Sequence, residues 1–575
     1  MRLQTSKTKN AESFYIVESI YVKGKRSNKV VKKLGTINQI RAMIGPDKDP
    51  YEWGREQAEI MTKKQQEEHE EDIMVKFSPF KQLETNQNNS CSLGYLFLQK
   101  IYNELNIPKI TAEISKSHSF EYDLDSILSS LIYARALYPA SKRQTFEITR
   151  NFAEPPKYEL HHVYRALSVL ASESDMIQAE LYKSSRKICE RNANVLYYDC
   201  TNYFFEIEQE DELRKYGYSK EHRPNPIVQM GLFMDGNGLP LAFNINPGNT
   251  NEQTTLKPLE KKILKDFGLS EFIVCTDAGL SSSDNRMFNS IQNRSFITTQ
   301  SLKNLKGYLK EWALSTTGFK LGDDEREYDV SAIDEDIYYN SIFWKEQWIN
   351  ENGIEQRLIV TYSPKYCNYT KQLRERHLNK AAKLISSNST SLSKKGGSDV
   401  SRYISAMNTT PDGEVAEKTT YSINETAVKE DSRYDGFYAA CTDLEGNPAT
   451  ILKVMKGRWE IEECFRIMKS EFEARPVFLS RKDRIKAHFL TCFMALLLYR
   501  ILEQRVQKID DKITTSKLLS TMQEMNAITR RDLYLPSYTR TDITDALHEI
   551  SGFRTDYDVL TAKKMRKIIK ESKKA

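Results

Sequence analysis

The sequence has few cysteines for its length, and none of them forms a C-x-x-C pair. Eight cysteines are scattered over 575 residues. A disulfide framework or a zinc site would need a regular or paired set, so we expect neither. The first residues, "MRLQTSKTKN", contain no apolar stretch, and we expect no signal peptide there. These absences fit a reducing compartment, and we expect a cytoplasmic protein.

Long hydrophobic runs are also missing. The longest, "FLTCFMALLLY" from Phe489 to Tyr499, is about half of the roughly 20 residues that span a bilayer. We therefore expect a buried helix and no membrane partner. Hydrophobic residues make up 39% of the chain and charged residues 28%, and the mean hydropathy is -0.60. This composition is typical of a soluble protein, and 575 residues are too many for one compact domain.

A strong charge of one sign is lacking as well. The formal net charge is +5 and the pI is near 8.5, which indicates a nucleic-acid partner only weakly. Basic residues gather at the end of the chain, where "TAKKMRKIIKESKKA" has seven Lys or Arg against one Glu. This stretch is either a frayed tail or a segment that contacts phosphates.

The pattern changes along the N-terminal third of the chain. Residues 13–37 alternate apolar and polar side chains around a Lys-Gly-Lys turn and predict a basic β-hairpin. The charge-rich residues 63–76 predict an exposed helix or a linker. From about residue 93 to residue 192 apolar residues recur at helical spacing, which predicts a helical region. DNA binding and simple packing both produce this pattern.

From Asn194 onward the sequence predicts strands and helices in the order β-β-β-α-β-α-β, which indicates a mixed α/β sheet. Residues 302–433 combine strand patterns, a helix and a polar loop. We interpret this segment as an insertion between two halves of one α/β domain. A strand in "YDGFYAACTDL" and a helix from about Lys456 begin the second half.

Two aspartates end two of the predicted strands. Asp199 follows "NVLYY" and Asp277 follows "FIVCT". In α/β sheets functional side chains gather at the carboxyl ends of strands, and two such acids can share a divalent metal such as Mg²⁺. Asp is also common as a simple turn residue at strand ends, so neither aspartate is decisive alone.

The segment "KGRWEIEECFRIMKSEF", from Lys456 to Phe472, holds four acids and four bases. A helix advances about 100° per residue. On that wheel one stripe is apolar and is predicted to face the core; its members are Ile461, Phe465, Met468 and Phe472. One flank of the stripe carries Arg458, Glu462, Arg466 and Lys469. Glu460 and Glu463 point to the opposite side.

Glu462 is therefore an acid among three bases, beside the core. Ion pairs on a solvated helix face stabilise a helix by only a few tenths of a kcal/mol. They do not favour one acid flanked by three bases on the same side of the helix. A metal-binding carboxylate with cationic neighbours for phosphates fits it better.

Taken together, these motifs resemble the DDE transposases of bacterial insertion sequences, in the group with a Tyr-x2-Arg-x3-Glu-x6-Lys signature. Arg458, Glu462 and Lys469 stand at the signature spacings, whereas Met455 stands at the Tyr position. "DCT" at Asp199 and "TDAGLSSSDN" at Asp277 resemble the first two acidic motifs. "GNTNEQTTLKPL" and "RWEIEECFRIMKSEFEARPVF" are similar to this group too.

The resemblance implies an α/β fold: a ribonuclease-H-like catalytic core interrupted by a mostly β insertion, plus a helical N-terminal region. Asp199, Asp277 and Glu462 would be the catalytic acids and would bind two Mg²⁺ ions, with Mn²⁺ as a substitute. Arg458, Lys469 and Arg466 would bind DNA. The partners would be double-stranded DNA, as element terminal inverted repeats and as target, and a second copy of the chain. The location would be the bacterial cytoplasm, at the nucleoid when DNA is bound.

The expected domains follow the pattern changes: 1–60, a basic β-hairpin region; 61–192, a linker and helical DNA-binding region; 193–301 and 434–505, the two parts of the core; 302–433, the insertion; and 506–575, a helical basic region. Two other functions stay open. One is a related metal-dependent nuclease that cuts DNA without joining it, and the other is an inactive DNA-binding protein derived from a transposase.

Overall fold

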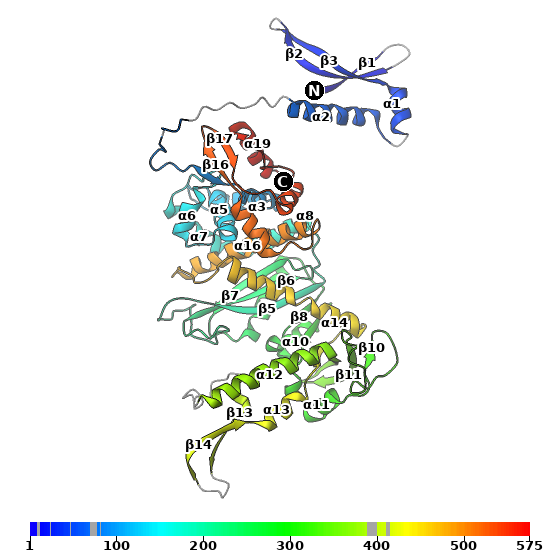
Figure 1. Cartoon of the computed structure of the whole chain (residues 1–575), viewed down its shortest axis with the longest axis vertical. Helices are drawn as coiled ribbons and strands as arrows, with labels where there is room; N and C mark the ends of the chain where they lie inside the picture. The colour runs from blue at the N-terminus through cyan, green and yellow to red at the C-terminus, as the bar shows by residue number, and fades with distance from the viewer. Residues whose placement is uncertain are drawn as a thin grey trace. The chain divides into compact units, whose positions relative to one another are not determined.

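The computed structural model describes residues 1–7, 12–22, 25–45, 48–68, 78–80, 82–387, 400–409 and 415–575. The chain forms two compact units, Met1–Gln87 and Asn88–Ala575 (Figure 1). The first unit therefore extends beyond the hairpin region expected for residues 1–60.

The first unit is a three-stranded antiparallel sheet with two helices. The predicted hairpin is present as β2 (Glu12–Val22) and β3 (Lys25–Thr36), and β1 (Arg2–Lys7) pairs with β2. Thr36 caps α1 (Ile37–Ile44) by accepting from the Gln39 amide. The helix α2 (Pro50–Glu68) follows, and its Tyr51 ring lies 5.0 Å from the ring of the buried Phe14.

The second unit begins with β4 (Ser90–Ser92) and a set of helices, as expected for most of residues 93–192. These are α3 (Tyr95–Glu104), α4 (Ile107–Ser117), α5 (Leu124–Leu137), α6 (Lys142–Thr149), α7 (Leu160–Ser172) and α8 (Ser174–Ile188). The apolar run at Phe489–Tyr499 lies in α16 (Lys482–Gln507). This helix packs against α3, α5, α7 and the sheet strand β7 (Figure 1).

The prediction that this run is a buried helix is confirmed. Among the described residues α16 alone is long and apolar enough to cross a membrane by length and composition, but 94% of its apolar window is buried inside the fold. It forms the core between the helical region and the sheet.

A nine-stranded mixed sheet forms the centre of the second unit. The predicted order of elements after Asn194 is confirmed: β5 (Val195–Phe204), β6 (Ile227–Asp235), β7 (Pro240–Pro247), α9 (Leu256–Asp266), β8 (Phe272–Thr276), α10 (Ser283–Asn289) and β9 (Arg294–Thr299). Across the sheet the strands run β10-β11-β12-β15-β9-β8-β5-β6-β7. β5, β8 and β9 are parallel neighbours, and β5, β6 and β7 form an antiparallel meander.

Residues 302–433 differ from the expectation of a mostly β insertion between the two halves of the core. The segment contains α11 (Gly307–Leu314), β10 (Lys320–Leu321), β11 (Phe343–Glu351), β12 (Ile354–Tyr362), α12 (Pro364–Ser386), β13 (Ile404–Thr409), β14 (Val415–Ile423) and α13 (Glu425–Ser432). α12 alone has 23 residues, whereas β11 and β12 have nine each. β12 pairs with β15 (Phe437–Thr442), which pairs with β9, so this segment widens the core sheet.

The C-terminal residues are helical only in part. α17 (Thr515–Glu524), α18 (Asp542–Ser551) and α19 (Ala562–Ser572) alternate with β16 (Asn526–Arg530), β17 (Leu533–Pro536) and β18 (Leu560–Thr561). These strands form a second sheet with β4. α19 packs on α3 through the buried Met565 and Ile568, so the basic end of the chain is part of the fold and not a frayed tail.

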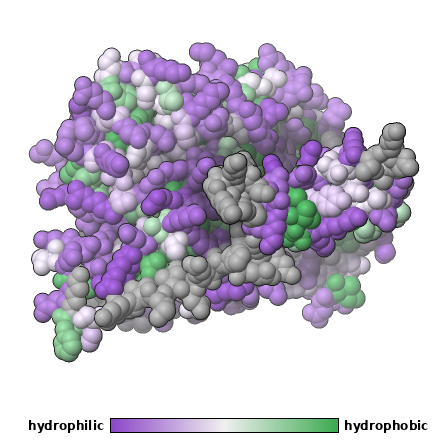
Figure 2. Space-filling view, turned by 90° about the horizontal axis from the view of Figure 1, so that it is seen from above, coloured by the Kyte–Doolittle hydropathy of each residue, from purple (hydrophilic) through white to green (hydrophobic). Residues whose placement is uncertain are grey.

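The face of the molecule drawn in Figure 2 is mainly hydrophilic, with hydrophobic side chains in small, separate groups. This agrees with the low mean hydropathy of -0.60. Scattered apolar side chains on a surface are normal.

Candidate active site

The two predicted aspartates lie side by side on neighbouring parallel strands. The register of β5 and β8 sets Tyr198 beside Thr276, and the next residue of each segment is an aspartate, Asp199 in β5 and Asp277 directly after β8. Neighbouring strands are about 4.8 Å apart. The structure therefore brings these carboxylates to the same place at the carboxyl ends of the strands.

Glu462 reaches this place on α15 (Trp459–Arg466). The preceding helix, α14 (Pro448–Lys456), is tied to β5 because the Tyr197 hydroxyl donates to the Val454 carbonyl at 2.6 Å. Gly457 joins the two helices, and a Cβ there would lie 2.2 Å from the Tyr197 hydroxyl. Only glycine lets the helices approach the strand so closely, and this positions Glu462 over the sheet.

Arg458 lies between the carboxylates. Its guanidinium is 3.4 Å from Asp277 Oδ2 and 3.5 Å from Glu462 Oε1. Burial opposes the charge of Arg458, but Asp277, Asp199 and Glu462 favour it, and its pKa is raised. One cation thus balances part of the negative charge of all three acids.

The environments of the two aspartates push their pKa values in opposite directions. Burial raises the pKa of Asp199 to about 6, although the Lys220 ammonium, the Cys200 amide and Arg458 oppose the rise. Burial also acts on Asp277, but Arg458, the Thr299 hydroxyl and the Ala278 amide outweigh it, and the pKa falls. The Thr299 hydroxyl donates to Asp277 Oδ1 at 2.7 Å.

A second group of cations lies beside Asp199. Burial and the neighbouring Lys220 lower the pKa of Lys469 to about 8, while Asp199 raises it. Lys469 Nζ is 3.3 Å from Glu221 Oε1, and Glu221 follows Lys220 directly in the loop between β5 and β6. Lys220 itself is 3.2 Å from Glu252. The signature lysine is therefore close to the first aspartate.

Arg466 has different contacts. Its guanidinium pairs with Glu463 at 2.7 Å and with Glu471 at 2.9 Å. The predicted core stripe of Ile461, Phe465, Met468 and Phe472 is buried as expected. However, residues Ile467–Glu471 form a π-helical turn, which changes the angular spacing assumed by the wheel.

Sequence reasoning did not find Lys220 or Tyr438. Lys220 lies in the loop between β5 and β6, where no periodic pattern marks it. Tyr438 lies in β15, and the charges of Arg458 and Asp277 both affect it. Burial raises the pKa of this phenol to about 12. Both side chains come from segments distant from the motifs, so their proximity is a tertiary effect.

The donor set fits a hard divalent cation. Asp199, Asp277 and Glu462 offer only carboxylate oxygens, and the side chains of Asp277 and Glu462 are 48% and 62% exposed. Among the described residues, a tighter group of three possible ligands is Asp545, His548 and Asp556, within 4.8 Å of one another. Arginines already pair with both of those aspartates, so the sheet carboxylates suit a metal better.

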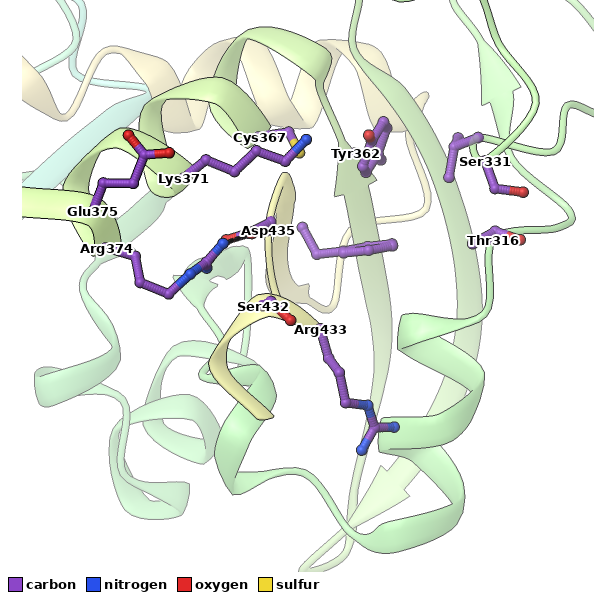
Figure 3. A pocket seen from close by; sticks show the side chains of 12 residues that line it. Thr316, Ser331, Tyr362, Cys367, Lys371, Arg374, Glu375, Ser432, Arg433 and Asp435 are labelled. Atoms are coloured by element: carbon purple, nitrogen blue, oxygen red, sulfur yellow. Dashed lines mark hydrogen bonds and ion pairs between the residues drawn. The ribbon is translucent and has the colours of Figure 1, made fainter. Parts of the chain in front are cut away.

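Two cavities of similar volume differ in their lining, and only the first of them contains residues of this site. One, of about 550 Å³, is lined by Arg458, Glu462, Met455 and Tyr438, among others. Another, of about 470 Å³, lies beside α12. Figure 3 shows Arg374 reaching toward Asp435 in the second cavity, where the two side chains form a two-pronged ion pair at 2.6 and 2.5 Å. That pair neutralises one base and one acid of the second cavity's lining, whereas the first cavity is lined by Arg458 and Glu462.

Three carboxylates gathered where two strands end and a helix crosses are an arrangement that metal-dependent phosphodiester enzymes use. The family model of the transposase DDE domain matches residues 203–498, and this chain belongs to that family. Asp277 and Glu462 lie inside the match, and Asp199 lies just before it.

A solved structure is similar to this chain at a low level: the cryo-EM structure of a piggyBac transposase synaptic complex with hairpin DNA. It is 8% identical, covers 83% of this chain and 85% of its own, and has a TM-score of 0.35. At this score the likeness carries no argument. The search of curated proteins found no match.

Proposed function

We propose that this chain is the DNA transposase of a bacterial insertion sequence, which cuts at the ends of its element and joins them to target DNA. The observation that carries the proposal is the convergence of Asp199, Asp277 and Glu462 around Arg458. Within the sheet, β7-β6-β5-β8-β9 would be the ribonuclease-H-like core.

The three carboxylates would hold Mg²⁺, with Mn²⁺ as a substitute, and the bound metal would supply Lewis-acid activation of an attacking oxygen and stabilise the leaving oxygen. Arg458 pairs with Asp277 and Glu462 in the free protein. On loading, its guanidinium would turn to the phosphates of the DNA, because the metal would replace its charge.

Lys469, with Lys220 beside it, would hold a backbone phosphate near Asp199. Arg466 would contact DNA only after leaving Glu463 or Glu471, so we expect a smaller contribution from it. Met455 carries no hydroxyl, and Tyr438 is a phenol that lines the same cavity. We propose that Tyr438 supplies the hydroxyl that the signature Tyr would otherwise provide.

Joining two element ends to one target requires both ends in one complex, so we propose a homodimer as the active form. Its DNA partners would be the terminal inverted repeats and the target duplex. We place the protein in the bacterial cytoplasm, at the nucleoid when it is bound to DNA.

The test mixes purified protein, Mg²⁺, labelled element ends and a supercoiled plasmid. A transposase joins the label covalently to the plasmid, because the freed 3′-hydroxyl stays bound as the next nucleophile. Efficient cutting without any joining, over a range of end sequences, would identify a nuclease instead. Binding without cutting would identify an inactive DNA-binding protein. The Glu462→Gln variant is the control for contaminating nucleases.

A further inference from the structure

A small, deep cavity lies where α5, the start of α6, the start of α16 and the loop after the π-helical turn meet. Its volume is about 160 Å³, several times the ~30 Å³ that a water molecule occupies in the liquid. Four basic side chains are among the residues that line it: Arg135, Lys142, Arg475 and His488. Glu473 is the one acid of the lining, and it is exposed.

Lys142 is the most unusual member of this lining. It is 5% exposed, yet no hydrogen bond or ion pair joins its ammonium to any residue in the described ranges. It is the first residue of α6, whose Ser141 cap accepts from the Gln144 amide. A cation there opposes the helix dipole, whereas an anion is favoured. A buried, unpaired charge is costly, so its retention calls for a partner.

Arg135 lacks part of its partners as well. It is 4% exposed. One terminal nitrogen donates to the Phe472 carbonyl at 3.0 Å, and the other donates to the Ala140 carbonyl at 2.8 Å. Its buried Nε has no hydrogen-bond partner among the described residues. The backbone contacts fix the guanidinium, and its Nε–H remains for a ligand.

Among the described residues, no acid forms an ion pair with these two cations. His488 is buried, and burial together with Lys142 and Arg135 lowers its pKa well below the usual value, so it is a neutral ring. Its Nε2 lies 3.1 Å from the Ala474 carbonyl. Burial and Arg135 lower the pKa of Lys142 to about 7, which is the response expected of a lysine that has no anion beside it.

We propose that this cavity is an oxyanion site that takes a phosphate group, bound by the Lys142 ammonium and the Arg135 Nε–H. A phosphate has several oxygens and accepts from both donors at once. The depth of Lys142 favours a terminal phosphate monoester or free inorganic phosphate over an internal diester, because a diester must keep two ester oxygens in its chain.

The position suggests which phosphate reaches it. Arg475, in the cavity lining, pairs with Glu221, and Glu221 also pairs with Lys469 beside Asp199. This chain of contacts links the cavity to the carboxylates, and we infer that the cavity takes the 5′-terminal phosphate of a DNA strand whose scissile bond lies at the carboxylates. The DNA arm of the proposal rests on the proposed function, whereas binding of inorganic phosphate does not.

The first experiment measures thermal unfolding of the full chain in phosphate or sulfate against chloride at equal ionic strength. We expect phosphate and sulfate to raise the Tm of the wild type, because a ligand that binds only the folded state stabilises it. Lys142→Met should unfold at a higher Tm in chloride and lose the response to phosphate. Arg143→Met, which removes the adjacent exposed cation, should respond as the wild type does.

An absent response in the wild type, or an unchanged response in Lys142→Met, overturns the site. Lys142→Gln repeats the measurement if the Met variant does not fold. The second experiment compares binding of one duplex with and without a 5′-phosphate. We expect about tenfold tighter binding of the phosphorylated duplex, lost in Lys142→Met. Equal binding of both duplexes, with the phosphate response intact, assigns the site to inorganic phosphate and overturns the DNA arm.

Discussion

The second unit contains two groups of charged side chains that differ in sign. Acids are in excess at the sheet, and bases are in excess in the cavity at α6. At the sheet, three carboxylates share Arg458, and the side chains of Asp277 and Glu462 are about half exposed. In the cavity at α6, Lys142 and Arg135 are about 5% exposed, and neither forms an ion pair with a residue in the part of the chain that the structure describes. Water solvates the exposed acids, so their excess charge costs little, but it cannot do so for the buried cations.

This difference separates function from stability. Changes at the carboxylates should alter catalysis and leave folding nearly unchanged. Changes at Lys142 should alter the free energy of unfolding, in a direction that depends on pH and on anions.

Glu462→Gln keeps the shape of the side chain and removes its charge. We expect cleavage to fall by more than ~100-fold, because even outer-shell partners of a metal are worth about 10–100-fold. Unfolding should be unchanged, since Glu462 is exposed and makes one weak ion pair at 3.5 Å. Rates of cleavage of a labelled element end and thermal unfolding measure the two effects, and activity in excess chelator should vanish likewise.

Two neighbouring glutamates are matched controls for Glu462. Glu463→Gln removes a partner of Arg466, which keeps Glu471, so little should change. Glu460→Gln weakens a half-buried pair with Arg500 at 2.5 Å and should cost about 1–3 kcal/mol of stability, while the folded enzyme still cleaves. An equal loss of activity in all three variants would mean that the catalytic face of α15 is wrongly assigned.

The pH dependence of stability tests the buried lysine. The pKa of Lys142 is about 7 in the folded state and near 10.4 in the unfolded chain. Between these values the unfolded state binds more protons, so the stability of the wild type rises with pH. In chloride, the advantage of Lys142→Met should be on the order of a few kcal/mol at pH 7 and should shrink toward pH 10.

The groups that face Lys142 do not reverse this trend. They are Arg135 on α5, Tyr164 on α7, His488 and Cys492 on α16, and Arg475 and Glu473 in the loop. Denaturant unfolding from pH 7 to pH 10 gives the difference between the two proteins. A difference that stays constant over this range would show that the ammonium is not buried as described.

Tyr438→Phe tests whether this phenol assists the carboxylate site. The Tyr438 hydroxyl lies near Arg458 and Asp277, and a single hydrogen bond is worth about 0.5–1.5 kcal/mol. Cleavage should therefore slow by roughly 2- to 10-fold at pH 7 with no change in Tm. If the change lowers Tm and leaves the rate unaffected, the phenol is a packing residue.

The smallest expected effect concerns the exposed basic face of α19. Lys563 and Lys567 are exposed, and replacing both by Ala should reduce the slope of log affinity against log salt by ~0.9 for each true phosphate contact. Lys261 and Lys265 on α9 have the same spacing and exposure and serve as the control pair. An identical slope in both double variants would remove α19 from the DNA interface.

We also expect Lys23, Lys25 and Arg26 of the basic hairpin in the first unit to contact DNA. Lys23 and the side chains of Lys25 and Arg26 lie outside the described residues. The hypothesis that they bind DNA therefore stays a prediction.

Local patterns predicted much of the fold and of the site. The strand order after Asn194 followed from apolar runs and turns, and the positions of Asp199 and Asp277 followed from strand ends. The pairing of β12 with β15 joins segments about 80 residues apart in sequence and leaves no local signal. The contact of Arg466 with Glu471 was missed because the wheel assumes 100° per residue, which the π-helical turn at Ile467–Glu471 does not keep. Its contact with Glu463 is an ordinary i,i+3 pair within α15 that the sequence pattern already allowed.

The place of β15 in the sheet also determines when the sheet and the carboxylate site can form during synthesis. β15 pairs with β9, although residues 300–436 separate them in the chain. Each doubling of such a loop adds about 0.6 kcal/mol to the entropy cost of closing it, and non-local pairing slows folding. Because α15 follows β15, a chain emerging from the ribosome carries both aspartates long before Glu462 arrives. A prematurely terminated product would therefore retain most of the sheet and lack the third carboxylate.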